Sequence, residues 1–76
     1  MPLVIEQDDR LWGVEVKKVA SVQSKDGRGL ARLAEQAGPS WQGGILLYTG
    51  TNTLRLEDIP SAFAVPMDQL WNKDIR

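Results

Sequence analysis

A continuous apolar run between glycines constrains the fold of this chain more than any other feature. Residues 44–49 read Gly-Ile-Leu-Leu-Tyr-Thr, with Gly43 before them and Gly50 after them. This pattern is typical of a strand that is buried on both faces in a parallel arrangement. We therefore expect the run to form the central strand of a sheet. A parallel neighbour requires a crossover connection, usually a helix, so the run predicts an α/β fold.

Two segments near the start of the chain predict a β-hairpin. Leu3-Val4-Ile5 and the alternating residues 12–17 flank residues 7–10, whose aspartate pair suits a turn. Successive side chains of a strand point to opposite faces. The second strand should therefore carry an apolar face and a charged face, formed by Trp12, Val14 and Val16 and by Glu15 and Lys17, respectively.

The segment between the hairpin and the apolar run predicts the crossover helix, over residues 24–37. Ser24 can cap its start, with Asp26 in the first turn, and Gly38-Pro39 marks its end. The apolar positions repeat with helical spacing, at Leu30, Leu33, Ala34 and Ala37. A right-handed crossover then places residues 44–49 parallel to residues 12–18.

The remaining residues predict two short strands and a terminal turn of helix that covers a sheet edge, at Leu54–Leu56, Ala62–Val65 and Pro66–Trp71. The expected order is β-β-α-β-β-β-α, a small α/β domain with a mixed sheet over residues 1–76. The three tryptophans, Trp12, Trp41 and Trp71, each lie beside apolar positions. We expect them to pack in the core or an interface rather than to stack on bases.

Composition excludes several kinds of chemistry. The chain has no cysteine and no histidine, which removes thiol nucleophiles and the usual zinc sites. Any metal would be a hard cation such as Mg²⁺, held by carboxylates and water. No apolar run approaches the roughly 18 residues that span a bilayer, so we expect a cytoplasmic protein without membrane contact.

Positive charge is concentrated in one segment. Residues 17–32 carry five cations and one acid, a net charge of +4, whereas the rest of the chain carries −5. We call these cations the basic cluster: Lys17, Lys18, Lys25, Arg28 and Arg32. Lys25, Arg28 and Arg32 have the i, i+3, i+7 spacing of one helix face. The cluster suits contact with nucleic-acid phosphates, although an ordinary solvated helix face would explain it about as well.

Glu15-Val16-Lys17 is the one constellation that resembles a catalytic site. A carboxylate at Glu15 can hold a metal ion, and Lys17 can orient the attacking water and neutralise phosphate charge during phosphodiester cleavage. An ordinary surface glutamate and lysine on the solvent face of a strand would explain the pair equally well.

An ordered series of segments resembles a known family. The segments are Val14–Lys17, Ser24–Asp26, Arg28–Leu30, Leu33–Glu35, Gly44–Gly50, Ala64–Pro66 and Leu70–Trp71. From Leu3 to Trp71 the chain resembles the C-terminal domain of unknown function attached to predicted prokaryotic AAA-type ATPases. Such domains are similar to the PD-(D/E)XK, or restriction-endonuclease-like, nucleases. The resemblance implies a restriction-endonuclease-like core that is N-terminally truncated.

In that family pattern, Glu15 matches the second metal-binding acid and Lys17 the catalytic lysine. The first acid precedes the strand that corresponds to Leu3–Glu6, where this chain has Pro2. Asp8 and Asp9 lie in the turn at the far end of the hairpin and cannot replace it. Mg²⁺ would therefore be a cofactor only if the site were completed, and the exposed edge at Leu3–Gln7 would favour a homodimer.

Three functions remain open. The first is a non-catalytic or vestigial nuclease-like module, the C-terminal part of an ATPase-associated domain, that binds nucleic acid or a partner protein through the basic cluster. The second is a metal-dependent nuclease that needs a missing N-terminal part to complete its site. The third is a purely structural or regulatory domain.

Overall fold

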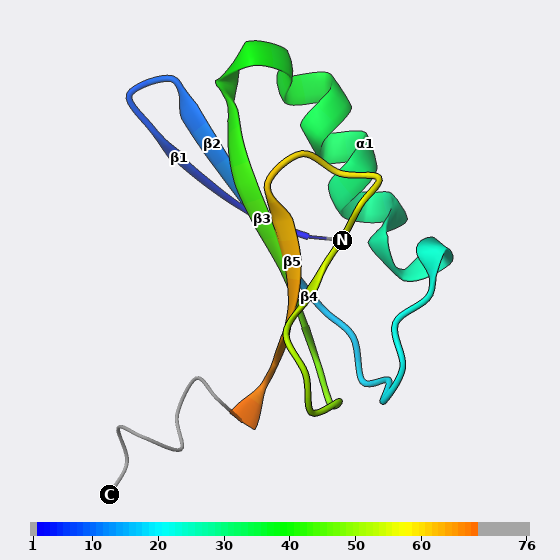
Figure 1. The fold of residues 1–76 in the computed structure, drawn as a ribbon. Helices are drawn as coiled ribbons and strands as arrows, with labels where there is room; N and C mark the ends of the chain where they lie inside the picture. Colours follow the sequence, from blue (N-terminus) through cyan, green and yellow to red (C-terminus); the bar gives the residue numbers. More distant parts are fainter. Residues whose placement is uncertain (1, 69–76) are drawn as a thin grey trace, which may run out of the picture.

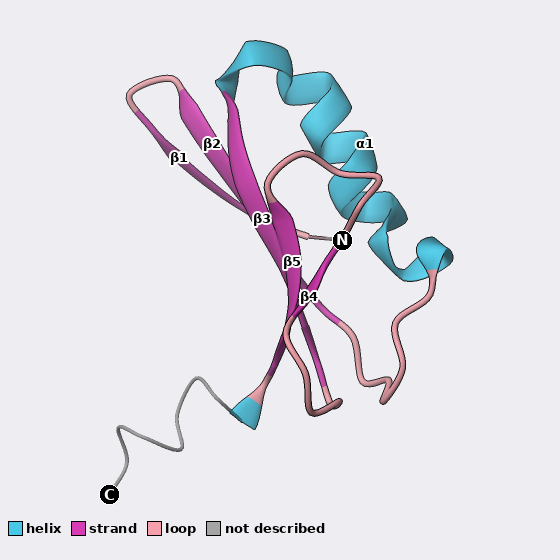
Figure 2. Cartoon of the chain, in the orientation of Figure 1, coloured by secondary structure: helices cyan, strands magenta, loops and turns pink. Residues whose placement is uncertain are grey.

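The protein forms a five-stranded mixed sheet with a helix on one face. The computed structural model describes residues 2–68, in which the strands follow the order β1-β2-β3-β5-β4 (Figures 1 and 2). The elements are β1 (Leu3–Gln7), β2 (Arg10–Val16), η1 (Ser24–Gly27), α1 (Arg28–Ala37), η2 (Gly38–Ser40), β3 (Trp41–Tyr48), β4 (Leu54–Arg55) and β5 (Ala62–Pro66). The predicted α/β class and mixed sheet are confirmed.

The predicted hairpin is present and is closed by a tight turn. β1 and β2 pair antiparallel, with Gln7 opposite Arg10. The two residues between them, Asp8 and Asp9, have φ angles of 52° and 67°. Positive φ at both central positions is the requirement of a type I′ turn, whose twist matches that of the strands. Aspartate is one of the few residues other than glycine that adopts this conformation readily, which explains the aspartate pair.

The crossover helix differs from its prediction at the start and agrees at the end. Residues 24–27 form a 3₁₀ turn, η1, and α1 begins at Arg28. The predicted cap at Ser24 is wrong, because the cap is one residue earlier: the backbone N–H of Gln23 donates to Asp26 Oδ2 at 2.8 Å. Gly38, with a φ of 57°, follows the last residue of α1 as predicted.

The central strand has the predicted position but not the predicted burial. β3 lies between β2 and β5 and runs parallel to both. Leu46 and Tyr48 are buried, whereas Ile45 before them is 40% exposed. The expectation of burial on both faces is wrong because α1 covers one face only (Figure 1). We call the other side of the sheet, which carries Val14, Ile45 and Phe63, the open face.

Glycines allow α1 to approach the sheet closely. A Cβ atom on Gly13 of β2 would lie 2.8 Å from Cδ2 of both Leu30 and Leu33. On β3, a Cβ atom on Gly44 would lie 3.0 Å from the Trp41 ring. The core is therefore concentrated between α1 and one face of the sheet, where the fully buried side chains include Leu30, Leu46, Ala62 and Ala64.

The C-terminal elements follow the prediction in part. β4 and β5 confirm the two short strands. Pro66 ends β5 instead of starting a helix, and the rest of the predicted terminal turn, up to Trp71, largely lies outside residues 2–68. Trp41 packs as expected and donates its indole N–H to the Pro60 carbonyl at 2.7 Å. Trp12 is half-buried on the open face. Within residues 2–68, no helix has the length and apolar character of a membrane span.

Candidate functional site

Glu15 and Lys17 share the face of β2 that α1 covers. Glu15 pairs with the fully buried Leu46, and its side chain is 7% exposed. The interpretation of Glu15 as an ordinary surface residue is therefore wrong. Lys17 follows the last residue of β2, is half-buried, and donates its backbone N–H to the Leu47 carbonyl at 2.8 Å. The predicted separation from Trp12, Val14 and Val16, which face the open side, is confirmed.

The first turn of α1 packs directly on the Glu15 carboxylate. Gly29 is the second residue of α1, and a Cβ atom there would lie 2.7 Å from Glu15 Oε1. The same Cβ atom would lie 3.4 Å from Cδ of Pro2. Glycine at position 29 thus leaves room for the carboxylate between the helix and the start of the chain. This proximity was not predicted from the sequence, although a glycine inside a helix often marks such a close approach.

Pro2 lies opposite Glu15 across the β1–β2 hairpin. Because Leu3 pairs with Val14 in the antiparallel hairpin, the residue before Leu3 is opposite Glu15. Pro2 offers no ligand there. Asp8 and Asp9 are in the turn at the other end of the hairpin, and Asp9 is six residues from Glu15, roughly 20 Å at about 3.3 Å per residue. In the part of the chain that the structure describes, no group of three or more acidic side chains could hold a metal ion. The described residues therefore do not fit a Mg²⁺ site.

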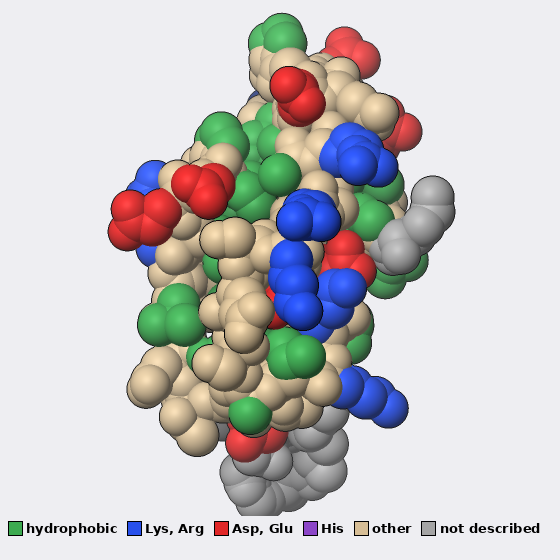
Figure 3. Space-filling view, turned by 90° about the vertical axis from the view of Figure 1, so that its right-hand side faces the viewer, with side chains coloured by type: hydrophobic (Ala, Val, Ile, Leu, Met, Phe, Trp, Pro, Cys, Tyr) green, Lys and Arg blue, Asp and Glu red, His purple; other side chains and the backbone are tan. Residues whose placement is uncertain are grey.

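The basic cluster lies beside this buried carboxylate. Lys25 belongs to η1, and Arg28 and Arg32 belong to α1; all three side chains are exposed. Lys17 and Lys18 come directly after β2, and Lys18 is also exposed. Figure 3 shows Lys and Arg side chains gathered in a column on one side of the molecule. No acid other than Asp26 interrupts the sequence of this segment, and Asp26 is buried at 8% exposure.

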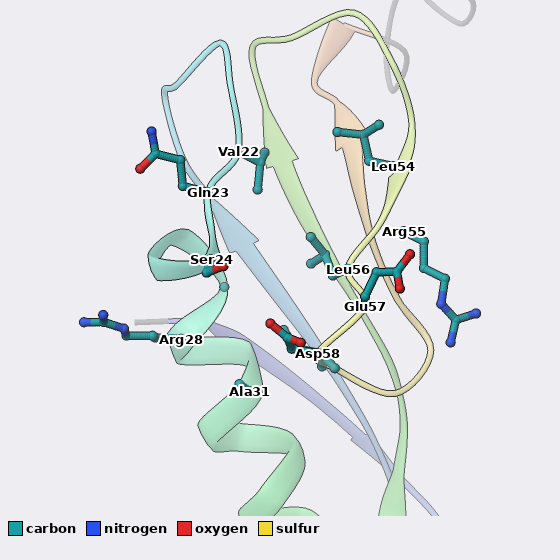
Figure 4. Close-up of a pocket in the computed structure, with 12 residues that line it drawn as sticks. Val22, Gln23, Ser24, Arg28, Ala31, Leu54, Arg55, Leu56, Glu57 and Asp58 are labelled. Carbon is teal, nitrogen blue, oxygen red and sulfur yellow. The ribbon is translucent and has the colours of Figure 1, made fainter.

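An open hollow lies on the other flank of α1, toward β4. Its volume is about 480 Å³, and its lining comes from residues 22–31 and from the loop at residues 54–59 (Figure 4). Val22, Ala31 and Leu56 give it an apolar floor, while the guanidinium of Arg28 points away from the 54–59 loop. Neither Glu15 nor Lys17 lines it. The hollow was not predicted from the sequence, because two segments far apart in the chain, residues 22–31 and residues 54–59, form it without a shared periodic pattern.

Comparison with known proteins identifies a family to which most of the chain is similar. The family model described as Domain of unknown function (DUF4143) matches residues 3–70. No curated protein and no solved structure matches the chain significantly.

The packing of Gly29 on Glu15 can be tested by a double-mutant cycle. Gly29→Ala normally stabilises a helix by up to about 1 kcal/mol. Here the added Cβ displaces the Glu15 carboxylate, so we expect little or no gain in the wild-type background. In a Glu15→Ala background the full gain should return, with a coupling energy of about 1 kcal/mol in urea denaturation. Additive effects of the two substitutions would contradict this packing.

Proposed function

The chain belongs to the family described as Domain of unknown function (DUF4143), and we propose on that premise that it is a cytoplasmic, non-catalytic nuclease-like module that binds nucleic acid. The observation that carries the proposal is the basic cluster. It concentrates a net charge of +4 in residues 17–32 of a chain whose overall charge is −1. Clustered exposed cations suit a phosphate backbone, since each ion pair with a phosphate releases condensed counterions.

We propose that the module is non-catalytic because Glu15 is a single carboxylate where metal-dependent cleavage needs more than one. Glu15 is buried beside α1, and the position opposite it is a proline. A single carboxylate does not fix both a metal ion and the geometry of an attacking water, on which the rate depends strongly. Binding through the basic cluster needs neither, so it can persist without cleavage.

The resemblance to the C-terminal domain of predicted AAA-type ATPases suggests an ATPase module as a further partner. We expect an ATPase module to present this domain to nucleic acid, or to use it as a regulatory element. The purely regulatory form of the hypothesis has no nucleic-acid ligand at all, so a binding measurement separates the two.

Charge reversal on α1 tests the binding proposal. We expect Arg28→Glu with Arg32→Glu to weaken binding to a short DNA duplex by about tenfold or more, because attraction to two phosphates becomes repulsion. The slope of log K against log salt should fall by about 1 for each phosphate that is no longer neutralised. Fluorescence anisotropy at several salt concentrations measures both quantities.

The matched control reverses the two arginines on the open face, Arg10→Glu with Arg55→Glu. This variant has the same net charge as the α1 variant, so it should bind DNA nearly as well as the wild type. Equal losses of affinity in the two variants would show a nonspecific charge effect. If the chain does not bind DNA, or if salt does not weaken the binding, the regulatory hypothesis is the one that remains.

A metal-dependent nuclease is the second candidate function. The buried Glu15 with Lys17 on the same face favours it, and the missing carboxylate opposes it. Pro2→Asp places an acid opposite Glu15. In an NMR titration with millimolar Mg²⁺, we expect the Glu15 amide to shift in this variant but not in the wild type or in Pro2→Asn. Cleavage of DNA by the wild-type chain that Glu15→Ala abolishes would support the nuclease hypothesis.

A homodimer through β1 is a further part of the proposal. β1 is at the edge of the sheet, and all five of its side chains are exposed. Unpaired N–H and C=O groups on such an edge favour pairing with another strand. We expect light scattering at high micromolar concentration to detect a dimer that Val4→Lys weakens. Val16→Lys, at a similarly exposed residue of β2, is the matched control, and a monomeric mass would contradict the proposal.

A further inference from the structure

The open face is a continuous apolar surface. One row of directly paired residues crosses four strands, from Leu3 of β1 through Val14 and Ile45 to Phe63 of β5. A second row joins Val16, Leu47 and Val65. Leu3 is 68% exposed, Val16 is 52% exposed, and Ile45 and Phe63 at the centre are each 40% exposed. Contiguous exposed apolar patches of this kind mark interaction sites.

The topology of the sheet indicates which element belongs on this face. β2, β3 and β5 are parallel to one another. Sheets built from parallel strands are normally covered on both faces, usually by helices. In residues 2–68, α1 covers one face only (Figure 1). A helix about 10 Å wide matches the span of two or three strands that lie about 4.8 Å apart.

Charge indicates the chemistry of that helix. Within residues 2–68, the charged side chains that the strands place on the open face are Arg10, paired with Gln7, and Arg55, paired with Phe63. Both are exposed, and neither is accompanied by a carboxylate from any described strand on the same face. A second copy stacked face to face would bring further arginines to this surface. Acidic side chains would instead complement it.

We propose that the open face docks an amphipathic helix of a partner protein, with the apolar stripe of the helix on Val14, Ile45 and Phe63 and acidic flanks toward Arg10 and Arg55. This surface is on the opposite side of the sheet from the basic cluster. The module can therefore hold a partner helix and nucleic acid at the same time.

The probe is a helical peptide of about 18 residues, or five turns, with leucines along one stripe and glutamates on both flanks. A matched peptide has lysines in place of the glutamates. We expect the glutamate peptide to bind about fivefold more tightly in calorimetry, since exposed charge pairs contribute modestly. Amide shifts in NMR should concentrate at Val14, Ile45 and Phe63 and spare α1.

Two variants test the site. Ile45→Asp should weaken binding of the glutamate peptide at least tenfold, because it places a charge at the centre of the interface. Leu54→Asp is its control: Leu54 is 44% exposed but pairs with Ala64 on the α1 side. Arg10→Glu with Arg55→Glu changes only exposed side chains and should make the lysine peptide the tighter ligand.

Three results would overturn the proposal. The first is unchanged peptide binding by Ile45→Asp. The second is equal affinity for the two peptides in the wild type and in the double arginine variant. The third is self-association of the chain that Ile45→Asp abolishes and Leu54→Asp does not, which would make a second copy the occupant of the open face.

Discussion

The close packing of α1 on β2 and β3 is the interaction on which the rest of the structure depends. Because residue 13 is glycine, Leu30 and Leu33 pack directly on the sheet, and Leu30 is fully buried. The same approach brings Gly29 against the Glu15 carboxylate. A chain of 76 residues buries only a modest fraction of its surface. Its core is therefore concentrated in one layer between helix and sheet, and within residues 2–68 no helix covers the other face of the sheet.

Strand alternation divides the chemistry of the molecule between two sides. On β2, the residues that face α1 include Gly13 and Glu15, whereas Trp12 and Val14 face away. The side with α1 carries a buried carboxylate and a column of cations along the helix. The other side carries apolar side chains with arginines at its margins. A one-residue slip of β2 would exchange these sides completely, so the tight turn at Asp8 and Asp9 that fixes the register also fixes which surface each residue type occupies.

Local signals in the sequence predicted the fold well. The aspartate pair predicted the hairpin turn, Gly38 predicted the helix end, and residues 44–49 predicted the central strand, because each depends on neighbouring residues alone. Burial was predicted poorly, since it depends on how many elements cover a strand. Ile45 has the same hydrophobic context as Leu46 in the sequence, yet only Leu46 faces α1. The alternation of residues 12–17 placed Glu15 and Lys17 together correctly but could not say that a helix would close over Glu15. The hollow beside Arg28 and Leu56 had no local signal.

With a partner helix on the open face, as proposed, the amount of folded protein would depend on the concentration of that partner. A ligand that binds only the folded state stabilises it by about 2.7 kcal/mol when its free concentration is about 100 times its dissociation constant. Small domains unfold with a free energy of only about 5–15 kcal/mol, so this gain is a substantial share of the total. Because Ile45 and Phe63 are exposed, the lifetime of the chain in a cell would increase with the concentration of the partner that covers them. Proteases would then degrade the copies of the chain that have no bound partner.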